Sequence, residues 1–183
     1  LHAQVPVIER LLAALGVPVL RVDGFEADDV MATVAARCGA EGVSCAIVSG
    51  DKDILQVLDE HVYVLEPEKG GGSYSPLRAE QVEARRGVRA DQIVDYLSLT
   101  GDQSDNVPGV RGIGEKTAVK LLAQWGSLDG IYGHLEEVTP PGVRKKLDEG
   151  RESALLSREL VALRRDVPLG SGFERGLESL RLG

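Results

Sequence analysis

The chain has 183 residues, of which 43% are hydrophobic, and a formal net charge of −8. This size and composition predict a folded protein with one core, or a core plus a small subdomain, and they exclude an intrinsically disordered chain. No apolar run approaches the roughly 20 residues that a membrane-spanning helix needs. The two cysteines, Cys38 and Cys45, match no zinc-binding pattern, so we expect reduced thiols in a cytoplasmic protein. The first residue is not Met and a helical pattern is already under way there, which predicts a fragment of a longer protein.

The first 65 residues alternate between helical and strand-like patterns. Apolar residues at helical spacing predict helices over 6–15, 26–37 and 53–58. Short apolar runs predict strands over 18–22, 44–49 and 61–65. The run over 44–49 is continuous, which is typical of a strand buried on both faces of a sheet. Together these patterns predict an α/β fold with a parallel sheet.

The pattern changes near residue 76. Residues 69–75 include three consecutive glycines and predict a loose hairpin or an exposed loop. Beyond them the patterns are helical, over 77–86, 90–100, 115–125, 127–135, 141–149 and 152–164. We therefore expect an α/β core over residues 1–76, a helical subdomain over 77–165, and a loosely ordered tail or linker over 166–183.

Acidic residues gather in three short clusters, each at the end of a predicted element. The clusters are Glu26 with Asp28 and Asp29, Asp51 with Asp53, and Asp102 with Asp105. Without these seven acids, 22 acids would stand against 21 bases, so the rest of the chain is nearly neutral. Helix capping or a turn can explain any one cluster taken alone. In the third cluster, a spacing of three would put both carboxylates on the same side of a helix.

The coincidence of three such clusters favours metal binding. Crowded carboxylates repel one another unless cations lie between them. Mg²⁺ and Mn²⁺ prefer oxygen ligands, and a pair of such ions about 3.5–4 Å apart can activate water for phosphodiester cleavage. The chain offers these carboxylates and no convincing protein nucleophile. The sequence therefore predicts a metal-dependent protein that processes DNA.

A glycine-rich turn with flanking bases precedes the helix predicted over 115–125. Its residues are Arg111, Gly112, Ile113, Gly114, Lys116, Thr117 and Lys120. Free backbone amides at such a turn can face a phosphate, and contacts of this kind bind the DNA backbone without reading its sequence. The same glycines could also serve only to turn a hairpin, and the residues alone leave that alternative open.

Four segments carry a resemblance to a known family. They are Phe25 to Asp29, Gly50 to Asp53, Leu99 to Asn106 and Pro108 to Ala118. In order and composition they resemble successive motifs of the 5′ nuclease (flap endonuclease) family, and within it the 5′→3′ exonuclease domain of bacterial DNA polymerase I. The resemblance covers at least residues 5 to about 165.

The resemblance implies a PIN-like α/β nuclease core, incomplete at its N-terminus, followed by a helix-hairpin-helix subdomain. It implies two Mg²⁺ or Mn²⁺ ions, one near Glu26, Asp28 and Asp29 and one near the other four acids. It also implies that the hairpin at Gly112 to Gly114 binds duplex DNA with a 5′ flap or single-stranded 5′ end and holds a monovalent cation such as K⁺. A polymerase domain in the same parent chain is a further expectation.

Family members begin with a strand that carries a metal-binding Asp, followed by a second acid and the basic residues of a helical arch. None of these is found in this sequence, and the missing strand is expected to leave apolar surface exposed. Three functions follow: a 5′→3′ exonuclease or flap endonuclease of replication and repair, a fragment that binds duplex DNA without cutting it, and a small-molecule phosphatase. The basic hairpin argues against the phosphatase, because a small substrate needs no distant phosphate contact.

Overall fold

The computed structural model describes residues 4–68, 70, 72–173 and 176–180. The chain divides into two units, and each is described by itself. Unit 1 consists of residues 1–45 and 163–183, and unit 2 consists of residues 46–162. Among the described residues, no helix is both long enough and apolar enough to cross a membrane.

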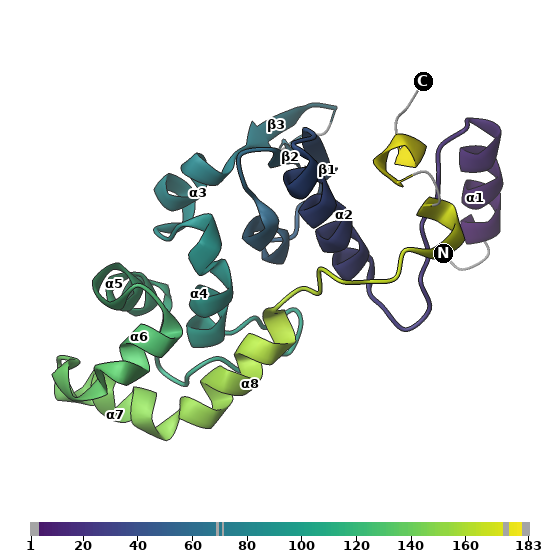
Figure 1. Cartoon of the computed structure of the whole chain (residues 1–183). Coiled ribbons are helices and arrows are strands. Elements are labelled where there is room, and N and C mark those ends of the chain that lie inside the picture. The colour runs from purple at the N-terminus through teal and green to yellow at the C-terminus, as the bar shows by residue number, and fades with distance from the viewer. Residues whose placement is uncertain (1–3, 69, 71, 174–175, 181–183) are drawn as a thin grey trace. The chain divides into compact units, whose positions relative to one another are not determined.

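Unit 1 is built around helix α2, Ala27–Glu41, which ends at Gly42 in the left-handed conformation (Figure 1). Val30 of this helix packs with Val167, Leu169 and Phe173 of the C-terminal segment. That segment forms two short 3-10 helices, η5 (Gly170–Phe173) and η6 (Gly176–Leu180). We expected a loosely ordered tail, but its described residues are packed because three large apolar side chains, one of them Phe173, bury themselves against α2.

Two further segments of unit 1 precede α2. Helix α1, Val5–Ala14, matches the predicted helix and has no buried residue. The strand predicted over 18–22 is wrong: these residues form no strand in the described structure, and Leu20 and Val22 pack against the core of unit 1 instead. Their apolar character reflects burial, and a strand also needs a neighbouring strand for its backbone hydrogen bonds.

Unit 2 contains the sheet. Strands β1 (Cys45–Val48), β2 (Val62–Pro67) and β3 (Tyr74–Leu77) lie in the order β1-β2-β3. The α/β prediction is confirmed, but the sheet is small and mixed, because β2 and β3 form an antiparallel hairpin. Residues 69 and 71 of the predicted glycine-rich loop lie outside the described residues. Burial of β1 on both faces is wrong, since its side chains alternate in burial and Val48 is 58% exposed.

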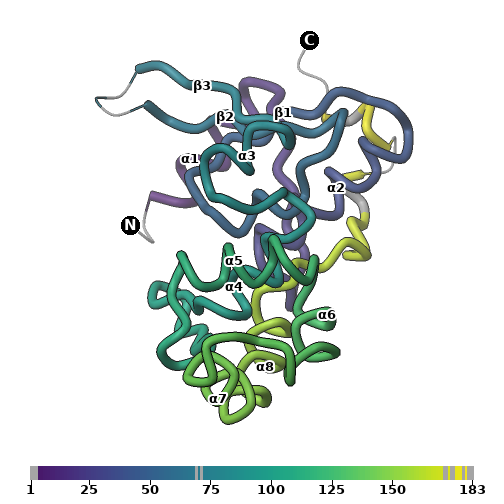
Figure 2. Tube along the Cα trace, turned by 90° about the vertical axis from the view of Figure 1, so that its left-hand side faces the viewer, coloured from purple at the N-terminus to yellow at the C-terminus, as the bar shows by residue number. Residues whose placement is uncertain are grey.

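Helices make up the rest of unit 2. The short helix expected at 53–58 is the 3-10 helix η2, Asp53–Val57. The later helices are α3 (Ala79–Arg86), η3 (Ala90–Gln92), α4 (Ile93–Thr100), α5 (Glu115–Trp125), α6 (Leu128–Gly133), η4 (Leu135–Glu137), α7 (Pro141–Glu149) and α8 (Arg151–Val161). Helices α4 to α8 gather at one end of unit 2 and the β2–β3 hairpin lies at the other (Figure 2). The domain limits at residues 76 and 165 remain predictions.

The core of unit 2 joins η2 to these helices. Its largest fully buried side chains include Ile54, Leu55, Leu99, Leu122, Leu128, Ile131 and Leu147. Ile54 and Leu55 directly follow Asp53, and Leu99 lies three residues before Asp102. Burial of these apolar neighbours therefore fixes the backbone on both sides of the acidic cluster described next.

Candidate metal centre

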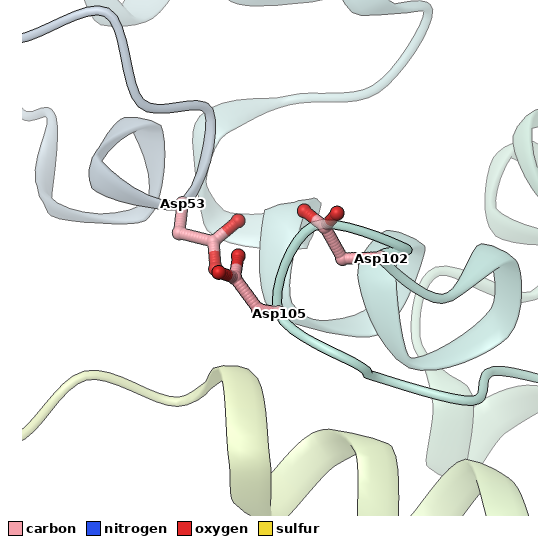
Figure 3. Close-up of side chains that lie close together, drawn as sticks. All are labelled: Asp53, Asp102 and Asp105. Atoms are coloured by element: carbon pink, nitrogen blue, oxygen red, sulfur yellow. The ribbon is translucent and has the colours of Figure 1, made fainter.

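Three aspartates from two segments of unit 2 come together. Asp53, Asp102 and Asp105 each offer a carboxylate oxygen, and these oxygens lie within 4.8 Å of one another. Figure 3 shows the three side chains converging, Asp53 from the start of η2 and the other two from the turn after α4. Asp102 is buried, Asp53 is half-buried and Asp105 is exposed.

A closed turn, not a helix, orients Asp102 and Asp105. The backbone N–H of Asp102 donates to the carbonyl of Val107 at 2.9 Å, and the N–H of Val107 donates back to Asp102 at 2.8 Å. The turn needs a left-handed residue, which Asn106 supplies with φ of 57°. The helical spacing argument therefore predicted the right neighbours for the wrong reason.

Asp102 carries strong partners inside the cluster. Its Oδ2 lies 2.6 Å from the Lys52 Nζ, and its Oδ1 accepts hydrogen bonds from the backbone N–H and the hydroxyl of Ser104. Burial by itself would raise the pKa of this carboxyl. The hydrogen bonds from Lys52 and Ser104 outweigh that effect, so the pKa of Asp102 is lowered and the group is ionised at neutral pH.

Asp53 has the opposite electrostatic character. Burial, together with repulsion from Asp51, Asp102 and Asp105, raises its pKa to about 6. Its Oδ1 is buried and has no hydrogen-bond partner among the described residues. A buried carboxylate oxygen without a partner costs free energy unless a cation or donor reaches it.

The cluster fits a hard divalent cation. Such an ion takes carboxylate oxygens as ligands, and its charge would offset the repulsion that raises the pKa of Asp53. The unpartnered Oδ1 of Asp53 supplies a free ligand atom. Asp51 stands slightly apart: it is exposed, and its Oδ1 accepts the backbone N–H of Asp53 at 3.0 Å.

The segment after the cluster is held by helix α8. The N–H of Gly109 donates to the Ser157 hydroxyl at 2.9 Å, and the Ser153 hydroxyl donates to the Gly109 carbonyl at 2.6 Å. Only glycine suits this position, because φ is 61° and a Cβ would lie 2.3 Å from the backbone nitrogen of Gly101. Two serines therefore hold the strap that joins the aspartate turn to the hairpin.

The predicted hairpin lies at the start of α5. Ile113 is buried, and Gly114 is the extended residue before the helix, with no side-chain cap. Arg111, Lys116 and Lys120 are exposed, whereas Thr117 is half-buried. The Gly112 carbonyl accepts a hydrogen bond from the Lys146 ammonium of α7 at 3.1 Å.

The first predicted acidic cluster belongs to unit 1. Glu26 is exposed and caps α2 only through its backbone, while Asp28 and Asp29 lie half-buried in the first turn. Asp29 also has a structural role, since its Oδ1 accepts the backbone N–H of Arg164 at 2.8 Å. The structure therefore groups the second and third clusters with each other, and the first is found in the other unit.

Comparison with known proteins assigns the family. A model for the 5′–3′ exonuclease N-terminal resolvase-like domain matches residues 1–87, and a model for the 5′–3′ exonuclease C-terminal SAM fold matches residues 88–180. The chain belongs to the 5′–3′ exonuclease family. The exonuclease resemblance of the sequence motifs is thereby confirmed.

Curated relatives of this exonuclease-family chain are bacterial polymerases. It is 44% identical over 182 residues to the thermostable DNA polymerase I of Thermus thermophilus, covering 97% of this chain and 21% of the relative. It is 48% identical over 168 residues to DNA polymerase I of Treponema pallidum (strain Nichols), covering 92% and 17%. The chain thus spans about a fifth of the length of the curated relatives it matches.

Solved structures share the fold at low identity. A mutant of the T5 5′-exonuclease has a TM-score of 0.70 at 22% identity, covering 88% of this chain and 68% of that one. The T5 5′-exonuclease with bound zinc ions has a TM-score of 0.66 at 22% identity, covering 78% and 51%. These likenesses support an exonuclease fold for the chain.

Four partners of the site and the hairpin are not predicted by the sequence. Lys52 lies between two acids in the chain, which is a signal for an ion pair, but its partner is Asp102 of another segment. Ser153 and Ser157 showed no signal, because their partner Gly109 is more than forty residues away. Lys146 is likewise remote from the glycine turn that it contacts.

Proposed function

We propose that this chain is part of a metal-dependent 5′ nuclease, a 5′→3′ exonuclease or flap endonuclease that hydrolyses DNA phosphodiesters in replication and repair. The observation that carries the proposal is the convergence of Asp53, Asp102 and Asp105, with an unpartnered buried oxygen, in a chain of the 5′–3′ exonuclease family. The parent protein would be a DNA polymerase I, as in the relatives that match over a fifth of their length.

In the proposed centre, Asp53, Asp102 and Asp105 hold one Mg²⁺ or Mn²⁺, with Asp51 contributing directly or through water. Glu26, Asp28 and Asp29 are proposed for the second ion. When bound, such ions supply an activated water and neutralise the charge on the leaving oxygen. The chain's own task is orientation: the Asp102–Val107 turn presents the aspartates, and Lys52 and Ser104 keep Asp102 ionised.

The proposed substrate is duplex DNA with a 5′ flap or a single-stranded 5′ end. In this proposal the backbone amides of Gly112 and Gly114 and the exposed Arg111, Lys116 and Lys120 contact phosphates beside the buried Ile113, and a K⁺ ion at the hairpin adds to this contact. Thr117, next to Lys116 in the first turn of α5, is included in this surface. Such contacts bind the DNA backbone irrespective of sequence.

Cleavage of a labelled 5′-flap duplex with Mg²⁺ or Mn²⁺ tests the catalytic part. The assay uses this chain and a longer parent chain that contains it, each with Asp51→Ala combined with Asp102→Ala. We expect the double substitution to abolish cleavage, whereas Glu80→Ala, at an exposed acid of α3, leaves the rate unchanged. Cleavage that survives the double substitution would refute the metal assignment. Duplex binding without cleavage by either wild-type chain would favour the non-catalytic DNA-binding alternative.

Duplex binding tests the hairpin separately. We expect Gly114→Val and Lys116→Glu to weaken duplex affinity about tenfold or more while leaving Mn²⁺ affinity unchanged, because the two sites share no side chain. Arg78→Glu, a matched reversal of an exposed positive charge between β3 and α3, is the control. Equal duplex binding by the wild type and both hairpin variants would remove the proposed role of the hairpin.

A further inference from the structure

Lys52 places a positive charge inside the acidic cluster. It lies between Asp51 and Asp53 in the chain, at the residue that caps η2. Its Nζ is 2.6 Å from the Oδ2 of Asp102. The Asp102 side chain is 1% exposed, whereas the Lys52 side chain is 39% exposed. The ammonium therefore reaches inward to a buried oxygen from a stem that remains in contact with solvent.

The charge of the cluster is poorly balanced without a metal ion. Asp51, Asp53, Asp102 and Asp105 bring four carboxylates together, and Lys52 supplies one positive charge to them. Lys52 contacts the buried Asp102 directly and is next to the half-buried Asp53 in the chain, so its positive charge offsets part of the repulsion among the carboxylates. In the metal-free chain this ammonium is thus the cation that holds the acidic turn against its own repulsion.

A divalent ion and this ammonium compete for the same oxygen of Asp102. Mg²⁺ binds carboxylate oxygens at about 2.0–2.1 Å, so an ion on Asp102 Oδ2 would have to share that oxygen with the ammonium that lies 2.6 Å from it. Two cations that close repel strongly in a partly buried site. The four-carbon stem of lysine is flexible and already half in solvent, so the ammonium can withdraw without disturbing the backbone.

We propose that Lys52 is a built-in counter-ion that pairs with the Asp102 ligand oxygen in the metal-free chain and is expelled when a divalent cation binds. The inference rests on the proposed metal centre and adds to it an exchange step that sets the affinity of the centre for its ion. When the metal ion binds, its two positive charges replace the single positive charge of the Lys52 ammonium. The ammonium protects the aspartate turn while no ion is present and lowers the affinity for the ion that replaces it.

Titration calorimetry with Mn²⁺ alone tests the exchange in the whole chain. Lys52→Met keeps the length of the stem and removes the charge, and we expect it to tighten Mn²⁺ binding about tenfold. Lys52→Arg keeps the charge and should stay within about threefold of wild type. Lys145→Met removes an exposed lysine of α7 that pairs with Glu149, and it should leave the affinity unchanged. Unchanged or weaker Mn²⁺ binding by Lys52→Met would overturn the proposal.

Lysine NMR separates expulsion from simple repulsion at a distance. With ¹³Cε-labelled lysine, the Lys52 signal is assigned by its loss in Lys52→Met. We expect a shifted, immobilised signal in EDTA that moves to the position of an exposed lysine when Mg²⁺ is added. A Lys52 signal that Mg²⁺ leaves in place would refute the exchange even if the affinity changed.

A failed metal centre would look different from a failed exchange. Asp53→Asn with Asp102→Asn serves as the reference without ligands. If wild type and this double variant both show no saturable Mn²⁺ binding, the metal centre itself is wrong and the exchange falls with it. If wild type binds Mn²⁺ and Lys52→Met binds it no more tightly, the centre stands and only the role of Lys52 is wrong.

Discussion

Asp53→Asn should stabilise the metal-free chain, although it removes a proposed ligand. The pKa of Asp53 is raised to about 6 from the ordinary 3.8, because burial and the neighbouring Asp51, Asp102 and Asp105 disfavour its charge. At neutral pH the folded chain must nevertheless carry that charge. Asparagine keeps the shape of the side chain, removes the charge and can donate to the neighbouring carboxylates.

The size and sign follow from the two pKa values. A rise of about two units corresponds to at most ~3 kcal/mol of destabilisation by the ionised form, and partial exposure of Asp53 reduces this to about 2 kcal/mol. Between pH 4 and pH 6 the folded state binds more protons than the unfolded state, so stability falls as the pH rises through this range. The penalty is fully present above pH 6 and shrinks to about 0.5 kcal/mol or less near pH 4.

Urea unfolding in EDTA at pH 8 and pH 4 measures this difference. Trp125, the single tryptophan of the sequence, lies in unit 2 with Asp53 and reports its unfolding. We expect Asp53→Asn to raise the free energy of unfolding by about 2 kcal/mol at pH 8 and by little at pH 4. Asp148→Asn, at an exposed acid of α7, is the control and should change it by less than about 0.5 kcal/mol at either pH.

Metal ions should reverse the order of stability. Saturating Mn²⁺ at pH 8 stabilises the wild type by mass action, whereas Asp53→Asn has lost a ligand and gains less. Three outcomes would each refute the reasoning: a destabilised Asp53→Asn in EDTA at pH 8, a stabilisation that does not depend on pH, or an equal gain from Mn²⁺ in both proteins. A metal-binding side chain that lowers the free energy of unfolding of the metal-free chain is expected where a site is arranged for its ion.

Three further substitutions test contacts around the site, each by chemical or thermal unfolding of the purified chain. Ser157→Ala leaves the buried N–H of Gly109 without its acceptor and should cost about 1–3 kcal/mol; no change would mean that α8 does not hold this strap. Gly109→Ala places a Cβ 2.3 Å from a backbone nitrogen and should cost at least about 3 kcal/mol, whereas Gly114→Ala, which meets open space, should cost less than about 1 kcal/mol; similar losses would contradict the packing described. Asp29→Ala removes the acceptor for the Arg164 N–H and should cost about 1–2 kcal/mol in EDTA as well as with Mn²⁺, and a loss seen only with Mn²⁺ would leave Asp29 without this structural role.

Local patterns predicted the helices of unit 2 well. The helices expected over 115–125 and 141–149 have those bounds in the structure, because periodic apolar residues and flanking Gly or Pro define both ends. The run over 18–22 was misread as a strand, since a short apolar segment has the same composition whether it pairs with a strand or packs as a loop. The apolar run of β1 likewise predicted burial on both faces, although its side chains alternate in burial.

The acidic clusters were visible in the sequence, and so was their fitness for cations, because carboxylate chemistry depends on residue type and spacing. Their grouping was not. Asp53 meets Asp102 and Asp105 through the packing of η2 and α4 around a shared core, and no local pattern encodes a contact between such distant residues. Lys52 shows the limit most clearly: the sequence places it beside two acids, yet its partner is the buried Asp102 of another segment. Residue identity thus determined which chemistry is possible, and tertiary packing decided which charges face one another, because electrostatic energy depends on distance in space and on burial.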